Sequence, residues 1–264
     1  MKFVSPSPRA VGSLLVLFAV LLVVVYSVAY VRTHSRPVTT VPAYTALEKV
    51  PILMYHSISK PGQGLSVSPK DFDAQIEWLV DNGYTPITLG QLKRYWDGEF
   101  NVQGKVVVIT FDDGYLDNYT DAYPILLKYH APATIFVITD SIKRDNHMKW
   151  SQMQEMHKHG IEFGSHMVYH SNFLHTSHDQ IAWELKMSKK DLEAGLNSPV
   201  TTFCYPGGGL IPEASDLVRE AGYTMAVTTR DTLADRSEDH LLLSRVRVVG
   251  GESLQEFASK LQTP

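Results

Sequence analysis

The sequence is poor in cysteine: its 264 residues contain only one, Cys204. No disulfide can form within the chain, and a zinc site built from several thiolates is excluded. Any bound metal must therefore be held by histidine and carboxylate side chains. Excess charge is lacking too, because the formal net charge is -4 and 20% of residues are charged, which indicates neither disorder nor nucleic-acid binding. No feature predicts a protein partner, and the length suits one globular catalytic domain.

Charged residues are absent from 11–31, VGSLLVLFAVLLVVVYSVAYV. The charged side chains in the short segment before this run are both positive, Lys2 and Arg9. About 20 apolar residues are needed to cross a bilayer. The run predicts an N-terminal transmembrane helix within residues 1–31, with the catalytic domain outside the cell membrane. The alternative is a cleavable signal peptide with the small residues at 27–29 as its cleavage site, which would leave the protein secreted.

The rest of the chain divides into a linker, 32–47, and a domain, 48–264. The linker mixes proline, threonine and scattered charge without a sustained period. In the domain, short apolar runs alternate with helical patterns. Strands are predicted at 51–55, 105–111, 133–139, 161–165, 201–205, 223–229 and 241–249. Helices are predicted at 68–83, 88–98, 117–129, 151–159, from Ser177 onward, 212–221 and 252–261. This order predicts an α/β fold with a parallel sheet, either a closed barrel or open and doubly wound, and chemistry beyond the carboxyl ends of the strands.

Two adjacent carboxylates, Asp112 and Asp113, follow the most apolar predicted strand, in the segment TFDDG. Charges at such a place cost free energy unless they are paired or bound to a cation. The plain alternative is that one aspartate caps the next helix while the other is solvated.

Two histidines, His166 and His170, follow another predicted strand in the segment GSHMVYH. Imidazole is the commonest protein ligand for zinc-like ions, and this short spacing lets two rings converge on one ion. Among 11 histidines some close pairs arise by chance, and we expect His157 and His159 to be such a pair. One aspartate and two histidines make a three-ligand set with open positions, beside which the second aspartate can act as a base.

The motifs TFDDG, His-x-x-x-His and FCYPGG (203–208) resemble the polysaccharide deacetylase family with the NodB-homology domain, carbohydrate esterase family four. The resemblance covers roughly residues 50 to 260. It implies a distorted (β/α) barrel that hydrolyses acetyl groups from N-acetylhexosamine units. Asp112 would be the general base, and a divalent metal, Zn²⁺ in the first place, would polarise the amide carbonyl and activate water. The implied ligands of the metal are Asp113, His166 and His170.

The third motif departs from the family. An arginine that orients the base is usual where Cys204 stands, whereas the Gly207 amide matches the usual oxyanion donor. Tyr205 is a candidate for contact with a sugar ring. We predict that Arg245, in the strand LLLSRVRVV, replaces the missing arginine, with a salt bridge at the rim as the alternative.

The general acid also departs from the family's usual pattern. A late Leu-x-His motif often supplies it, but no histidine follows His240. The segment MYH at the end of the first strand resembles a branch with permuted motif order and makes His56 the candidate acid. The alternative is a histidine packed at a strand end. Met167 stands where a serine or threonine is usual, which predicts weaker support for the metal ligands.

These features together predict an exported enzyme that removes N-acetyl groups from a cell-surface polysaccharide, either peptidoglycan of the cell wall or poly-N-acetylglucosamine. By their resemblance to the exopolymer-like branch of the family, the MYH strand and the LSRVRV strand favour the exopolymer. Two alternatives stay open: a metal-dependent hydrolase of another small N-acyl compound, and a surface glycan-binding protein with little or no turnover.

Overall fold

The strand that precedes the two aspartates is β6 (Lys105–Phe111), in a computed structural model that describes residues 46–60 and 62–261. Every residue of β6 after Lys105 is buried. Parallel strands covered on both faces carry such continuous apolar runs, which explains the sequence VVVITF.

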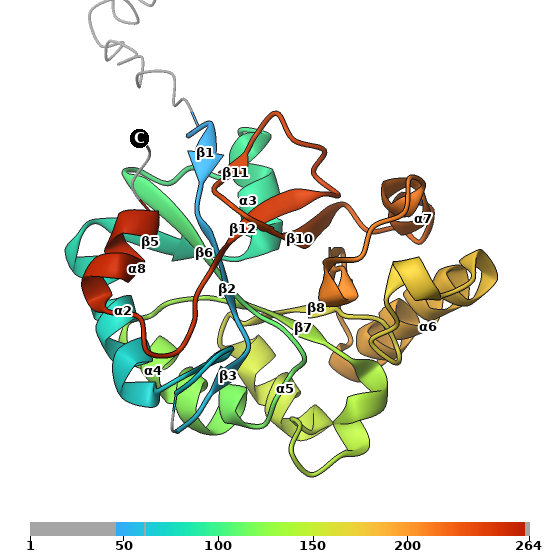
Figure 1. The fold of residues 1–264 in the computed structure, drawn as a ribbon, viewed down its shortest axis with the longest axis horizontal. Coiled ribbons are helices and arrows are strands. Elements are labelled where there is room, and N and C mark those ends of the chain that lie inside the picture. The colour runs from blue at the N-terminus through green and yellow to red at the C-terminus, as the bar shows by residue number, and fades with distance from the viewer. Residues whose placement is uncertain (1–45, 61, 262–264) are drawn as a thin grey trace, which may run out of the picture. The chain divides into compact units, whose positions relative to one another are not determined.

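The strands around β6 form a parallel sheet that closes on itself (Figure 1). Its order is β2-β12-β10-β9-β8-β7-β6-β5, and an additional pairing of β2 with β6 closes a ring of seven strands within the described residues. The strands besides β6 are β2 (Ile52–Tyr55), β5 (Tyr84–Ile87), β7 (Thr134–Val137), β8 (Glu162–Ser165), β9 (Thr202–Cys204), β10 (Met225–Asp231) and β12 (Leu243–Arg247). The closed barrel expected from the family resemblance is therefore present.

The strand β5 makes the barrel irregular. Val108 of β6 is in register with both Ile52 of β2 and Ile87 of β5, so these two strands lie on opposite edges of β6. No strand is predicted at the position of β5, where Pro86 cannot donate to a strand ladder. Two further pairs are short: β1 (Lys49–Val50) with β11 (Ala234–Asp235), and β3 (Ser57–Ile58) with β4 (Ser66–Val67).

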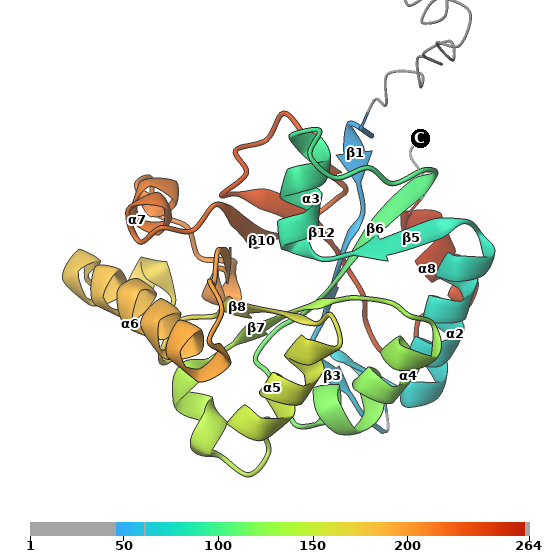
Figure 2. The same ribbon diagram turned by 180° about the vertical axis from the view of Figure 1, so that it is seen from behind.

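The helices lie around the outside of the barrel in both views (Figures 1 and 2). They are α2 (Pro69–Asp81), α3 (Leu89–Trp96), α4 (Tyr123–Lys128), α5 (Trp150–Lys158), α6 (His178–Leu196), α7 (Ala214–Glu220) and α8 (Leu254–Lys260). Four short turns of other helix types are η1 (Asn118–Ala122), η2 (Thr139–Lys143), η3 (Phe173–His175) and η4 (Pro206–Gly208). The Ser68 and Ser177 side chains cap α2 and α6 by accepting hydrogen bonds from the N–H groups of Asp71 and Gln180.

The predicted membrane segment, 1–31, lies outside the described residues, as does most of the predicted linker. No helix in 46–60 or 62–261 has the length and hydrophobicity that a bilayer span requires. At the end of the predicted linker, the Leu47 N–H donates to the Tyr95 hydroxyl, and the Trp96 indole N–H donates to the Leu47 carbonyl.

Because the barrel strands are parallel, their carboxyl ends meet at one end of the barrel. His56 follows β2, Asp112 and Asp113 follow β6, and His166 follows β8. The residues singled out at strand ends in the sequence are therefore brought to the same end of the fold.

Candidate metal centre and active site

The backbone turns sharply between the two aspartates and the next residue. Asp113 has a φ of 74° and Gly114 a φ of 76°, both in the left-handed region. This conformation is uncommon for a residue with a side chain, and such positions cluster at functional sites. The turn sends the two adjacent carboxylates to different partners.

Asp113 faces the two predicted histidine ligands. Its Oδ1 atom lies 3.5 Å from Nε2 of His166 and 3.6 Å from Nε2 of His170. Donor atoms bound about 2.1 Å from one ion at tetrahedral angles lie about 3.4 Å apart. The spacing of the three donors therefore fits a zinc-like ion, and His166, His170 and Asp113 form a group able to hold one.

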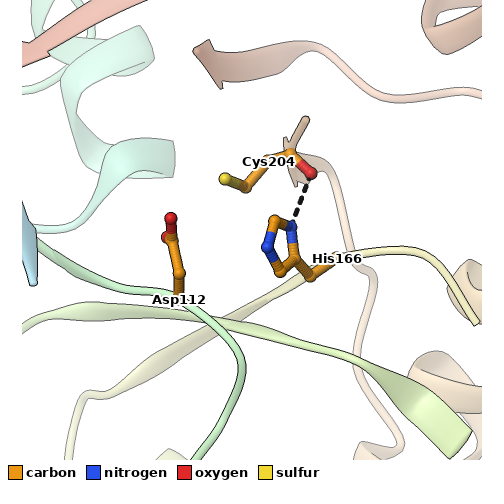
Figure 3. A group of neighbouring side chains, drawn as sticks. All are labelled: Asp112, His166 and Cys204. Atoms are coloured by element: carbon orange, nitrogen blue, oxygen red, sulfur yellow. Dashed lines mark hydrogen bonds between the residues drawn. The ribbon is translucent and has the colours of Figure 1, made fainter. Parts of the chain in front are cut away.

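A backbone carbonyl fixes the orientation of His166. Its Nδ1 lies 2.8 Å from the Cys204 carbonyl oxygen (Figure 3). A carbonyl only accepts hydrogen bonds, so Nδ1 carries the proton and Nε2 keeps its lone pair towards Asp113. Burial lowers the pKa of His166 despite the nearby carboxylates, which favours the neutral imidazole that a metal requires.

The turn that carries both histidines is held by a residue that the sequence analysis missed. The Glu184 carboxylate, fully buried on α6, accepts hydrogen bonds from the N–H groups of Val168 and Tyr169. The Ser171 hydroxyl and the Gln180 amide also donate to it. Glu184 thus ties the metal turn, which we define as residues 166–170, to α6.

A signal for Glu184 was present in the sequence. It lies on the apolar stripe of α6, whose buried members are Ile181, Glu184, Leu185, Ser188, Leu192 and Leu196. A carboxylate on such a stripe must be paired or hydrogen-bonded, because an unpartnered buried charge is very costly. This requirement pointed to a structural partner, although not to the metal turn in particular.

Met167 occupies the place where the family usually has a hydroxyl. Its side chain is fully buried, and its φ of 68° is again left-handed. The Met167 N–H donates to the Ser165 hydroxyl, which also lies 2.7 Å from the Ser188 hydroxyl. Support for the metal turn therefore comes from Ser165 and Glu184.

Arg245 binds the other aspartate. Its Nη1 and Nη2 groups donate to Oδ1 and Oδ2 of Asp112 at 2.7 and 2.8 Å. The remaining N–H groups point at the Thr110 hydroxyl, the Thr228 carbonyl and the Cys204 sulfur, so the buried guanidinium has an acceptor for each of its donors. Burial alone would raise the pKa of the Asp112 carboxyl, but Arg245 holds it well below its ordinary value. The contact predicted between Arg245 and Asp112 is present.

Cys204 belongs to a second group of potential donors, with Asp112 and His166 (Figure 3). Burial raises the pKa of its thiol well above the ordinary value, although Arg245 lies 3.2 Å away. Both oxygens of Asp112 already accept from Arg245. A neutral thiol and a committed carboxylate suit a metal poorly, so the Asp113 group is the better metal site.

His56 also lies close to Asp112. Its Nε2 is 3.8 Å from Oδ2 of Asp112, and its Nδ1 is buried without a hydrogen-bond partner in the described part of the chain. The side chain is 17% exposed, so it is open to a ligand at one edge. The position is compatible with proton transfer to a bound substrate.

The glycine-rich segment after β9 lies beside the metal turn. Gly207 has a φ of 60°, and a side-chain carbon at Gly209 would come within 2.1 Å of the Asn172 amide oxygen. Asn172 is two residues beyond His170. The predicted oxyanion donor is therefore on a segment that packs against the continuation of the metal turn.

Tyr205 lies elsewhere than expected. Its side chain is fully buried and packs edge-to-face against Phe173 and Phe203. The prediction that Tyr205 contacts a sugar ring disagrees with this position, because neither ring face reaches solvent. Strand alternation turned this side chain into the core.

Known proteins resemble this chain in sequence and in fold. Residues 100–226 match the family model described as Polysaccharide deacetylase. The chain is 40% identical over 215 residues to YxkH of Bacillus subtilis, a protein named as a polysaccharide deacetylase, and the match covers 81% of this chain and 77% of the relative. The chain belongs to the polysaccharide deacetylase family.

Other proteins resemble the chain at lower sequence identity. The poly-β-1,6-N-acetyl-D-glucosamine N-deacetylase of Staphylococcus aureus is 26% identical over 210 residues, covering 74% of this chain and 72% of that protein. Among solved structures, the Streptococcus pyogenes deacetylase PplD in complex with acetate has a TM-score of 0.77 at 32% identity, covering 83% of this chain and 100% of that one. IcaB from Ammonifex degensii has a TM-score of 0.73 at 26% identity, covering 83% and 99%.

The segment that matches the polysaccharide deacetylase family, residues 100–226, contains only some of the candidate site residues. Residues 100–226 include both aspartates and the metal turn. His56 and Arg245 lie outside this segment: His56 directly follows β2 and Arg245 is on β12, and these two strands pair with each other in the barrel. Closure of the barrel brings these two residues to Asp112.

Proposed function

We propose that this chain is a metal-dependent deacetylase that removes acetyl groups from N-acetylglucosamine units of a cell-surface polysaccharide, with poly-β-1,6-N-acetylglucosamine as the preferred class of substrate. The proposal rests on one observation: the adjacent residues Asp112 and Asp113 have different partners. Asp113 faces two histidines, whereas Asp112 is bound by Arg245. The relative from Staphylococcus aureus, named for that polymer, supports the choice of substrate.

Asp113, His166 and His170 would hold the metal, and zinc fits the donor set best. A divalent ion bound there supplies a Lewis acid for the acetyl carbonyl and lowers the pKa of water at the site. The Cys204 carbonyl and Glu184 keep the histidine side chains and their turn in place for this task.

Asp112 is the general base in this proposal. Its carboxylate stays ionised because of Arg245, so it can accept a proton from the water that attacks the acetyl carbon. The Gly207 N–H is the proposed donor to the oxygen that gains negative charge. His56 gives a proton to the departing amine, so that acetate and a free amino sugar are the products.

Acetate release from acetylated β-1,6-linked glucosamine oligomers tests the proposal. The full-length chain with added zinc should release acetate, and Asp112→Asn should lower kcat about a hundredfold or more. Asp145→Asn is a matched control, because Asp145 is fully exposed and its nearest cation is 3.9 Å away. Equal release by wild type and Asp112→Asn would contradict the assignment of the base.

A wild-type protein that binds zinc and the polymer but releases no acetate would instead favour the glycan-binding alternative. Release from small N-acyl compounds with none from the oligomers would favour the small-molecule hydrolase.

A further inference from the structure

Two aromatic side chains at the metal turn are exposed. Tyr169 belongs to the turn itself, and Trp183 lies on α6. Tyr169 is 55% exposed and Trp183 is 45% exposed. Their rings are nearly parallel, with an interplanar angle of 21° and centroids 6.3 Å apart. Contiguous exposed apolar surface commonly marks a site of interaction.

The backbone fixes this pair relative to the candidate metal ligands. Tyr169 immediately precedes His170, whose side chain is 43% exposed. Trp183 immediately precedes Glu184, and the Glu184 carboxylate accepts a hydrogen bond from the Tyr169 N–H. One carboxylate therefore ties together the helix that presents Trp183 and the turn that presents both Tyr169 and His170.

The chemistry of the pair suits a sugar. A pyranose ring has apolar C–H faces and a polar rim, so it packs its face on an aromatic ring while its hydroxyl groups remain in water. Tyr and Trp offer such faces together with a polar atom at the ring edge. A polymer whose reacting unit lies at the metal must continue over the adjacent surface, and Tyr169 is the chain neighbour of the partly exposed His170.

We propose that Tyr169 and Trp183 form a subsite for a hexosamine unit of the polysaccharide next to the unit that loses its acetyl group. This inference rests on the proposed function and names where the neighbouring part of the chain binds. Tyr205 lies in the core, so in this proposal the exposed aromatic faces come from Tyr169 and Trp183 instead.

The test compares substrates of different length. For Trp183→Ala and Tyr169→Ala, kcat/KM on a β-1,6-linked N-acetylglucosamine pentamer should fall about tenfold, the loss expected when one well-packed aromatic face is removed. On 4-nitrophenyl acetate, which has no second sugar, the loss should be much smaller. Trp183→Phe and Tyr169→Phe keep a ring face and should retain most of the pentamer activity.

Leu127→Ala is the matched control, because Leu127 is 43% exposed and lies on α4, which carries none of the candidate site residues. Unchanged pentamer kinetics in both alanine variants would overturn the subsite. An equal loss on both substrates would also overturn it, since that result indicates a general disturbance of the metal turn.

A binding measurement separates this inference from the proposed function. If wild type releases no acetate from any N-acetylated sugar, the proposed function fails, and retardation in native gels that contain poly-β-1,6-N-acetylglucosamine decides the subsite. Retardation of wild type that is lost in Trp183→Ala would support the subsite. No retardation of wild type, or equal retardation of both proteins, would overturn it.

Discussion

Arg245 donates to both carboxylate oxygens of Asp112 from a fully buried position, although 133 residues separate the two in the chain. The bidentate geometry both orients the carboxylate and keeps it ionised. Cys204, in the place where the family usually has its arginine, contacts the same guanidinium. The positive group is thus present at the site, but it comes from another strand.

Replacing Arg245 should reveal this pairing in the pH dependence of the reaction. In Arg245→Gln, burial would no longer be opposed by the guanidinium, so the pKa of Asp112 should rise and the acid limb of the kcat/KM profile should move to higher pH. An unmoved acid limb would show that Arg245 does not act through Asp112. Arg247→Gln on the same strand is the control.

The same pair should affect stability in a defined pH range. Because the folded-state pKa of Asp112 is lowered, its ionisation stabilises the fold above the unfolded-state pKa of about 4, and this contribution is lost as pH falls below that value. Arg245→Gln should lower the free energy of unfolding by about 3–5 kcal/mol at neutral pH, because it leaves a buried charge unpaired. Urea denaturation between pH 3 and 7 should show this difference shrinking towards the acid end.

Metal content should distinguish the two groups of donors. His170→Ala should lose bound zinc and activity, whereas Cys204→Ser should retain about one ion per chain, because the carbonyl of residue 204 and not its sulfur supports the site. Elemental analysis after dialysis against zinc gives the content directly. Loss of zinc from Cys204→Ser with retention in His170→Ala would place the ion in the group that contains Cys204 and would contradict this prediction.

Glu184→Gln should weaken metal binding without removing any ligand. The amide keeps one acceptor oxygen but loses the charge that attracts four donors, so zinc affinity should fall about 10- to 100-fold. Competition with a chromogenic chelator measures this affinity. Glu193→Gln is a matched control on the same helix, because the Glu193 carboxylate accepts a hydrogen bond from the Val200 N–H and not from the metal turn. Equal affinities in wild type and Glu184→Gln would contradict the positioning role.

His56→Ala should affect substrates according to their leaving groups. An amine must be protonated as it departs, so loss of a general acid should lower kcat on the N-acetylated pentamer about a hundredfold or more. Nitrophenolate leaves without a proton, and hydrolysis of 4-nitrophenyl acetate should therefore change little. Equal losses on both substrates would indicate that His56 acts on an earlier step or only on packing.

The strand-end residues could be foreseen because a parallel sheet brings its carboxyl ends together. Asp113, His166 and His170 need only the strands β6 and β8 to be recognised, and both are apolar runs bounded by turns. Arg245 could be proposed because it lies on a predicted strand, LLLSRVRVV, of the same sheet. Its bidentate contact could not, since that depends on how β12 and β6 are placed around the closed ring.

Other features depended on packing that no local pattern reveals. Tyr205 follows a strand as the site residues do, yet its ring joins the cluster with Phe173 and Phe203 in the core. Glu184 is on a helix and reaches the metal turn only because α6 packs beside β8. Trp183 falls within the helix predicted from Ser177 onward, and only the packing of α6 shows that its side chain reaches the surface.

Asp112 meets its arginine only when β12 pairs with β2 and β2 pairs with β6, and β12 is the last of these strands to be synthesised. All three candidate metal ligands are translated before residue 171, but the guanidinium partner of Asp112 is translated more than seventy residues later. A chain still emerging from the ribosome can therefore present the ligands before the base has its arginine. The complete hydrolytic apparatus can form only once nearly the whole domain has been made.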